Sequence, residues 1–249
     1  MRNWTMVALP LALAMTVTAC SAESGRSDAN EKRVVDAGPA SSQGFDLSGF
    51  TGVKVAGPDD VTIRRGDDFS IVARGPQAVI DELQIELDGD MLSIGRKKSN
   101  LRFTGGEDAV TVTVIMPALS ALRLTGSGEV EADAVNGDTV EAILTGSGDL
   151  NIAALNGKAA KLRITGSGDL KVGGGTIAAG DYDVTGSGSI EAGGLAAATL
   201  DVSIAGSGDV DAKASDSADI MILGSGNATI GGGGKCSTRT LGSGNAICK

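Results

Sequence analysis

The tripeptide Gly-Ser-Gly occurs seven times in this chain of 249 residues, and a Glu or Asp follows it in four copies. A serine between two glycines with an acid behind it is compatible with three structures. It can be a phosphate-binding loop, a sharp turn that exposes a nucleophilic serine, or a chain reversal without chemistry. The first two require particular neighbours, so the residues around each serine decide among the three.

The neighbouring residues exclude a phosphate loop and a nucleophilic serine. A phosphate loop has the pattern GxxxxGK followed by Ser or Thr. The nearest match, GGGGKCS at 231–237, has Cys236 after Lys235 and Thr229 in place of the first glycine. A nucleophile turn places its glycines two residues from the serine, whereas here they are adjacent to it. The chain also contains no histidine, which excludes His-based triads and most zinc sites.

The acidic residues behind the tripeptide allow one further chemistry, a row of cation ligands. If the copies stack on one another, neighbouring carboxylates lie about 5 Å apart, and a bound Ca²⁺ would relieve their repulsion. The alternative is that these side chains only accept hydrogen bonds from backbone amides of the turn. We favour this alternative; under the first interpretation the candidate metal ligands are Asp149, Asp169 and Asp209.

The spacing of the tripeptide identifies a structural repeat. Successive copies are 20, 20, 20, 20, 18 and 18 residues apart. Apolar residues stand two and four positions before the first glycine in six of the seven copies, and again two and four positions after the second glycine. Alternation on both sides of the turn predicts two short strands per copy, each with one buried face.

A repeat of this regularity predicts an all-β fold, a right-handed single-stranded parallel β-helix with coils of about 18–20 residues. In such a solenoid, equivalent strands of successive coils pair in parallel, and the buried residues form ladders in a narrow core. The glycines would form the corner of each coil, where the chain needs a positive φ or a close backbone approach. The predicted corner glycines include Gly126, Gly128, Gly146, Gly148, Gly166, Gly168, Gly186, Gly188, Gly206 and Gly208.

Residues 44–120 predict less regular coils before the repeats at 121–249. Short runs of alternating apolar residues are separated by clusters such as GPDD at 57–60, a pattern typical of strands joined by tight turns. The segment PQAVIDELQIEL at 76–87 is different, because Pro76 suits a first helical turn and several apolar residues would share one helix face. We expect a short helix there.

The N-terminal residues predict export and lipidation. An apolar run, too short to span a bilayer, ends in VTAC, which is typical of a bacterial lipobox. Residues 1–19 would be the signal peptide and Cys20 the lipidated first residue, and Ser21 favours sorting to the outer membrane, in either the periplasmic or the surface-facing orientation. An ordinary signal peptide cut near Ala19 is the alternative. Residues 20–43, small and polar, would form a flexible tether.

The net charge predicts how the protein contacts a membrane. The formal charge is −10, and loss of the signal peptide would remove Arg2 and make it one unit more negative. This sign opposes binding of nucleic acid or an anionic lipid surface through the folded domain. Membrane attachment would therefore come through the N-terminal lipid alone.

Two cysteines remain beyond Cys20, and they predict a disulfide. Cys236 and Cys248 are an even pair in an exported protein. Closing a loop of this length would stabilise the fold by about 3 kcal/mol in the chain-entropy model and would cap the last coil. A redox or metal pair is the alternative, but CxxC spacing and neighbouring ligands are missing.

Three segments resemble a known family in their order and spacing. They are GFDLSGFTGVKVAGPDDVTIRRGDDFSIVARG, DGDMLSIGRK and VTVTVIMPALSALRLTGSGEVEA. They resemble the DUF2807 family, described as auto-transporter adhesin head GIN domains, and the likeness covers about residues 43–249, so that 44–249 would be one such domain. The resemblance implies a right-handed single-stranded β-helix and an adhesive function, and it brings no catalytic residues.

The sequence therefore predicts a lipid-anchored, non-catalytic solenoid of the cell envelope. It would act as a binding, adhesion or structural module for an unknown protein or glycan, without a cofactor. A Ca²⁺-responsive envelope protein is one alternative. A polysaccharide-acting β-helix enzyme is a less favoured one, because sugar-binding clefts commonly use aromatic platforms and aromatic residues make up only 2% of the chain.

Overall fold

A computed structural model describes residues 33–36, 40–97, 101–104 and 110–249. The predicted signal peptide at 1–19 and Cys20 lie outside these residues. No helix in the described part of the chain has the length and hydropathy needed to cross a bilayer.

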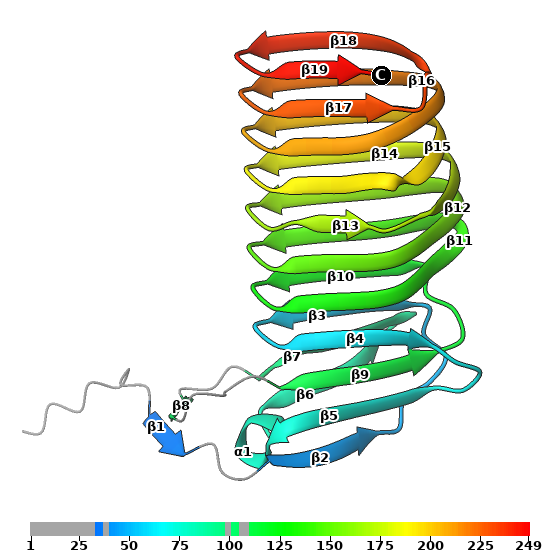
Figure 1. Ribbon diagram of the computed structural model, residues 1–249. Helices are drawn as coiled ribbons and strands as arrows, with labels where there is room; N and C mark the ends of the chain where they lie inside the picture. The colour runs from blue at the N-terminus through cyan, green and yellow to red at the C-terminus, as the bar shows by residue number, and fades with distance from the viewer. Residues whose placement is uncertain (1–32, 37–39, 98–100, 105–109) are drawn as a thin grey trace, which may run out of the picture. The chain divides into compact units, whose positions relative to one another are not determined.

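The repeats form a parallel β-solenoid, as Figure 1 shows, which confirms the predicted fold class. Register is kept from coil to coil: Glu129 pairs with Asp149, and Gly146 with Gly166. The strands of the repeats are β10 (Ala121–Gly126), β11 (Glu129–Gly146), β12 (Asp149–Gly166), β13 (Leu170–Val172), β14 (Gly175–Gly186), β15 (Ser189–Gly206), β16 (Asp209–Gly224), β17 (Asn227–Gly231), β18 (Lys235–Gly242) and β19 (Asn245–Cys248).

The solenoid has two sheet faces that meet at the column of Gly-Ser-Gly corners. We call face A the segments that follow a corner, and face B the segments that precede one. Long strands such as β11 contribute to both faces, because the chain bends near residues 133–138 without leaving the ladder. On both faces, alternate side chains are buried and form an apolar core.

Each corner needs both of its glycines, for different reasons. Gly146 has a φ of 127°, and a Cβ there would lie 2.3 Å from the carbonyl oxygen of Gly126 in the coil below. Gly148 has no such φ, but its Cβ would lie 2.3 Å from the oxygen of Gly128. The amides of Ser147 and Gly148 donate to the Gly126 oxygen at 3.0 and 3.1 Å. The corner is therefore a backbone contact between coils, and the serine side chain stays exposed.

The core is narrow, and the large side chain of Tyr182 fits in it because a neighbouring residue lacks a side chain. Tyr182 is fully buried, and a Cβ at Gly180 would lie 2.8 Å from its ring. Burial raises the pKa of the Tyr182 hydroxyl. The aromatic ring therefore serves packing and is not presented to a ligand.

The N-terminal part of the solenoid does not follow sequence order. Its strands are β2 (Ala40–Phe45), β3 (Gly52–Gly57), β4 (Asp60–Arg65), β5 (Ser70–Pro76), β6 (Leu83–Asp88), β7 (Met91–Arg96) and β9 (Thr111–Met116). On face B, β3 lies between β7 and β10; on face A, β4 lies between β9 and β11. The strands β2, β5 and β6 pair antiparallel with their neighbours. The end of the solenoid is thus closed by reversed strands.

The short helix predicted near 76–87 is confirmed, although it occupies only the first part of this segment. The helix α1 covers only Gln77–Ile80, and Leu83–Asp88 forms β6. In this segment Leu83 and Ile85 alternate with polar residues, a period that suits a strand. A two-residue turn with Gly89 at a φ of 63° then pairs β6 with β7.

The solenoid begins earlier than the predicted start at residue 44. The strand β2 begins at Ala40 and pairs antiparallel with β5, so the end of the predicted tether at 20–43 is part of the sheet. Backbone hydrogen bonds hold this strand, and its side chains are mostly exposed. The sequence therefore lacks the apolar alternation that would have predicted it. A separate pair of strands, β1 (Arg33–Asp36) and β8 (Leu101–Thr104), is parallel.

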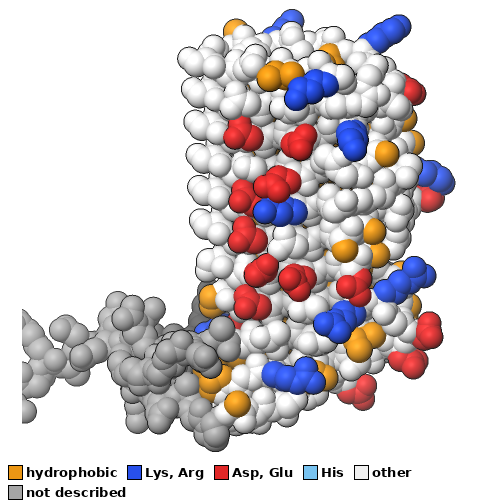
Figure 2. All heavy atoms as spheres, in the orientation of Figure 1, with side chains coloured by type: hydrophobic (Ala, Val, Ile, Leu, Met, Phe, Trp, Pro, Cys, Tyr) orange, Lys and Arg blue, Asp and Glu red, His pale blue; other side chains and the backbone are white. Residues whose placement is uncertain are grey.

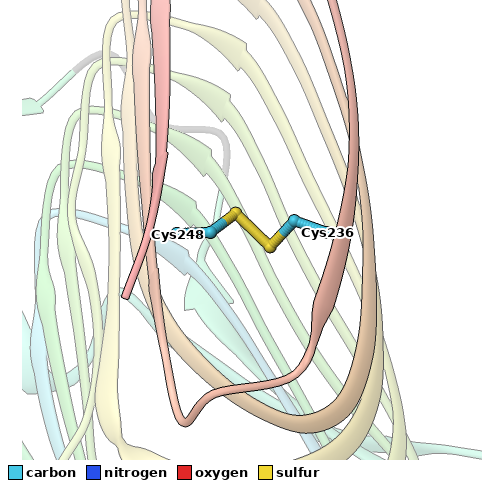
Figure 3. The surroundings of a disulfide bond; sticks show 2 residues. All are labelled: Cys236 and Cys248. Atoms are coloured by element: carbon cyan, nitrogen blue, oxygen red, sulfur yellow. A yellow bond between two sulfur atoms is a disulfide. The ribbon is translucent and has the colours of Figure 1, made fainter.

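The last coil carries the predicted disulfide between Cys236 and Cys248. It joins β18 to β19 across the end of the core (Figure 3). In this coil Thr238 and Thr240 occupy the positions above Ile220 and Ile222. Hydroxyl side chains and a covalent link therefore replace the apolar ladder where the core meets solvent.

Candidate binding surface on face A

Face A presents columns of acidic side chains to solvent. Side chains at equivalent positions of successive coils project outward about 4.8 Å apart, and Figure 2 shows the acids gathered near the corner edge. The acids on or beside this face are Asp60, Glu129, Glu131, Asp133, Asp149, Asp169, Glu191, Asp209 and Asp211. Ligands that contact this face would meet a repeated array of carboxylates.

The predicted metal ligands Asp149, Asp169 and Asp209 lie in one column and act as turn acceptors. The Asp149 carboxylate accepts from the Asp169 amide at 3.4 Å, and the Asp169 carboxylate from the Ser189 amide at 3.1 Å. Asp209 accepts from the Asn227 amide at 2.8 Å. Among the described residues, no group of three or more acids or cysteines is placed to hold a metal ion. The contacts fit the turn interpretation.

A groove of about 460 Å³ crosses face A near its N-terminal end. Four strands contribute to it: β4, β11, β12 and β13. The polar side chains that line it are Thr62, Arg64, Glu131, Asp133, Asn151 and Lys171. Because each strand belongs to a different coil, the groove extends about 14 Å along the solenoid axis.

Three charged side chains of this groove have no partner within the described part of the molecule: Arg64, Glu131 and Asp133. Two other polar side chains of the lining have partners: Asn151 donates to Glu129 at 2.8 Å, and the Lys171 ammonium lies 3.5 Å from Glu191. The groove therefore offers one free cation and two free carboxylates close together. This arrangement suits a polar ligand that carries hydroxyl groups or charges of both signs.

A second hollow of about 390 Å³ lies further along face A. Its floor is Ile190 and Val210, and its polar lining contains acids and no base: Ser189, Glu191, Asp209, Asp211, Asn227 and Thr229. It lacks the mixed charges of the first groove.

Face B holds an acidic column that the sequence analysis missed. Asp181, Asp201 and Asp219 occupy equivalent positions of successive coils. Partial burial, and then the charges of Asp181, Asp219 and Asp183, raise the pKa of the Asp201 carboxyl. The sequence does contain a signal for this column, because an Asp stands five residues before the first corner glycine in three consecutive copies. The sequence analysis considered only the acids that follow the tripeptide.

The bend opposite the corner also uses side chains that the sequence analysis missed. Asn156 donates to Asn136 at 3.0 Å, and its own carbonyl oxygen accepts from the Thr176 amide at 3.2 Å. Both residues stand in an Asn-Gly pair at the 20-residue spacing, which could have identified a second turn in these two coils.

The carboxylates of face A do not form a recognisable acid and base pair. Such a pair needs two carboxyl groups in different environments, whereas those on face A are all exposed or half-buried. No aromatic residue lines either hollow. The geometry fits binding by exposed polar groups better than it fits glycoside cleavage.

Comparison with solved structures identifies several similar folds. A crystal structure named "putative adhesin" from Bacteroides fragilis has a TM-score of 0.79 and 21% identity, covering 85% of this chain and 97% of that chain. Another "putative adhesin", from Parabacteroides merdae, has a TM-score of 0.70 and 20% identity, covering 87% and 99%. A "putative lipid binding protein" from Parabacteroides distasonis has a TM-score of 0.70 and 21% identity, covering 87% and 100%. These likenesses concern the fold.

No curated protein matches the chain. The comparison with protein families matches residues 49–234 to DUF2807, described as "Putative auto-transporter adhesin, head GIN domain". The match spans β3 to β17, including the antiparallel strands β5 and β6, and leaves out β2 and nearly all of the last coil. The chain therefore belongs to the DUF2807 family.

Proposed function

We propose that this protein is a lipid-anchored binding module of the cell envelope and that its ligand contacts the groove on face A. The family description names an adhesin, which supports a binding role at the envelope. The VTAC lipobox supports a lipid on Cys20 and an outer-membrane location. The solenoid would act without catalysis, as a rigid carrier of its outward side chains.

The observation that carries the proposal is the set of unpartnered charges in the groove. Arg64, Glu131 and Asp133 come from two neighbouring coils, and no ion pair or hydrogen bond within the described structure uses them. A charged group without a partner exchanges its bonds to water for bonds to a ligand, and each such hydrogen bond gains about 1.5–3 kcal/mol net. The rigid ladder below holds these groups at fixed separations, which lowers the cost of ordering them on binding.

The shape of the groove favours an extended polar ligand. A span of about 14 Å accommodates a few sugar units or four residues of an extended peptide. Guanidinium and carboxylate groups together suit hydroxyl-rich or zwitterionic chains. We therefore propose an extended envelope glycan or peptide segment as the ligand class.

The test is affinity capture from envelope fractions with three immobilised proteins. Wild type should retain the ligand, and Arg64→Ala combined with Glu131→Ala should retain at least tenfold less, because two polar contacts are lost. The matched control is Lys161→Ala with Asp219→Ala, which removes one base and one acid from face B. Equal capture by all three proteins would overturn the groove as the binding site.

Lipidation has its own test. Cells given labelled palmitate should label wild type, and Cys20→Ser should abolish the label while leaving the solenoid folded. Label that persists in Cys20→Ser would contradict the proposed lipid anchor and would leave the proposal about the groove unaffected.

A further inference from the structure

We propose that the two ends of the solenoid bind each other between copies of the chain, so that the protein associates head to tail. The proposal is independent of the ligand groove. It rests on what the outermost strands of face B expose at each end.

Both ends of face B have a strand with a free backbone edge. Among the described strands, β6 pairs only with β7, and β18 pairs only with β16. A free edge presents unpaired amide and carbonyl groups, which another strand can bind. The strand β18 runs parallel to β10 and β3 through the ladder, and β6 runs antiparallel to β7 on the same face. On face A, β2 lies beyond β5 and extends the sheet one strand past the level of β6. A second copy stacked on the last coil therefore brings its β2 next to β19, and its β6 faces β18 across about two strand spacings.

The charges of the two ends are complementary. Residues 81–90, DELQIELDGD, include β6 and carry five acids without a base. Residues 232–249, which form the last coil, carry three bases, Lys235, Arg239 and Lys249, without an acidic side chain. Figure 2 shows basic side chains gathered at the C-terminal end. In a protein with a net charge of −10, a basic end is a local reversal of sign that favours an acidic partner.

The complementary charges also lie on the same side of their strands. Arg239 pairs with the exposed Met221, and its neighbours Thr238 and Thr240 lie above core residues, so Arg239 points outward. On β6, Ile85 pairs with the buried Ile94, so Glu86 points outward as well. Long side chains of opposite charge on the same outward side attract each other across this spacing.

Exposed apolar side chains also occur at both ends of the solenoid. The large hydrophobic side chains that are exposed in the described structure all lie toward the ends of the solenoid. Leu87 is on β6, and the others are in the last two coils: Met221, Leu223, Leu241 and Ile247, with Leu241 the most exposed at 62%. Leu87 lies opposite the buried Leu92 and points inward, whereas Leu241 lies above the exposed Leu223 and points outward. Burial of either side chain by the second copy adds hydrophobic stabilisation.

The partner is a second copy because the chain itself supplies the acidic edge that its basic edge requires. Such an interface is heterologous, so it can continue beyond a dimer into short filaments. The contact between single strands is small and its charges are exposed, so we expect association at micromolar or higher concentration that weakens with salt.

Sedimentation velocity of the purified full chain tests the proposal. Wild type should form dimers and longer species as concentration rises, and added NaCl at about 0.5 M should dissociate them. Arg239→Glu should weaken association at least tenfold, and so should Glu86→Arg. The chain with both changes should recover it, because the opposite charges are restored with their places exchanged. The control Lys161→Glu, in the middle of face B, should behave as wild type.

Several results would overturn the proposal. They are a wild type that stays monomeric at all concentrations, an Arg239→Glu variant that matches the Lys161→Glu control, or association that survives Glu86→Arg. The last would mean that the basic end pairs with something other than the β6 edge. A monomer that binds phosphatidylglycerol vesicles through Arg239 would assign this end to a membrane surface and refute the pairing of copies.

Discussion

Asp59 and Arg96 form a two-point ion pair at the corner below the first Gly-Ser-Gly. The Arg96 Nε lies 2.8 Å from one carboxylate oxygen, Nη2 donates to the other, and the Val110 amide adds a contact of 3.2 Å. Asp59 is only 2% exposed. It stands where later corners have their second glycine, since Gly128 packs directly on its backbone. The side chain points away from the repeats and ties them to the N-terminal strands.

Replacing Asp59 with Ala should destabilise the fold by about 3 kcal/mol, because the change removes the carboxylate that binds the part-buried Arg96 guanidinium and accepts from the buried Val110 amide. The neighbouring exposed Asp60 accepts one amide hydrogen bond, from Glu129, and Asp60→Ala should cost about 1 kcal/mol or less. Urea unfolding compares the two. Equal losses would contradict the structural role of the ion pair.

Replacing individual turn glycines with alanine should destabilise the fold by different amounts. Gly146→Ala combines an unfavourable φ with a contact of 2.3 Å to a backbone oxygen, and it should cost at least about 3 kcal/mol. Gly148→Ala meets a backbone oxygen at 2.3 Å without the strained φ and should also be strongly destabilising. Gly89→Ala has a φ of 63° with open space around it, so only about 1 kcal/mol of strain is expected.

Ser147→Ala is the control for this series, and it should be nearly neutral because the corner uses the serine amide. Thermal unfolding measures all four variants. A Gly148→Ala protein as stable as the wild type would show that the coils are not in backbone contact at the corner.

Because of the acidic column on face B, we expect Asp201→Asn to increase the stability of the fold by an amount that depends on pH. The pKa of Asp201 is raised in the folded protein by burial and by its carboxylate neighbours, so the ionised side chain disfavours folding. At neutral pH the Asn variant should be more stable by about 0.5 kcal/mol. The gain should shrink as pH falls through the raised folded pKa and vanish below the unfolded value near 3.9.

Thermal melts of both proteins between pH 3 and 7 test this dependence. Asp133→Asn serves as the comparison, since Asp133 shares a groove with Arg64 and should gain nothing. A difference between Asp201→Asn and the wild type that is constant with pH would rule out titration of this column as the cause.

The disulfide should hold the last coil in place. Removing it by Cys236→Ala and Cys248→Ala should cost about 3 kcal/mol, and the loss should be local because coils of a solenoid contact only their neighbours. Hydrogen exchange should become faster in β18 and β19 and stay unchanged in β12. Uniform acceleration along the solenoid would contradict a local cap.

The repeats were predictable because every copy occupies the same environment. Seven corners at nearly constant spacing report both the turn and the buried positions, so the ladder from Val130 to Ile230 and the Cys236–Cys248 link follow from the sequence. The N-terminal order was not predictable, because β3 joins β7 and β10 through contacts between residues about 40 and 70 positions apart. Alternation of apolar and polar residues identifies such strands but does not show which strands pair with each other.

The groove was not predictable for a related reason. Arg64 and Lys171 are more than 100 residues apart in sequence, and they reach one groove only because β4 takes its place below β11. The acids that follow four of the tripeptides suggested a cation site, yet in the structure Asp149 and Asp169 accept hydrogen bonds from backbone amides of the next turn. Outward charges without a local partner were the signal that mattered, and sequence alone does not show which charges are paired.

The central claim is that the groove on face A binds a ligand without transforming it, and recovery of that ligand tests it most directly. The material captured from envelope fractions would be incubated with wild type and with the Arg64→Ala and Glu131→Ala double variant, then weighed by mass spectrometry. We predict retention by wild type, at least tenfold weaker retention by the variant, and an unchanged ligand mass. A shortened or otherwise altered ligand, produced by wild type and not by the variant, would contradict the claim and make the groove an active site.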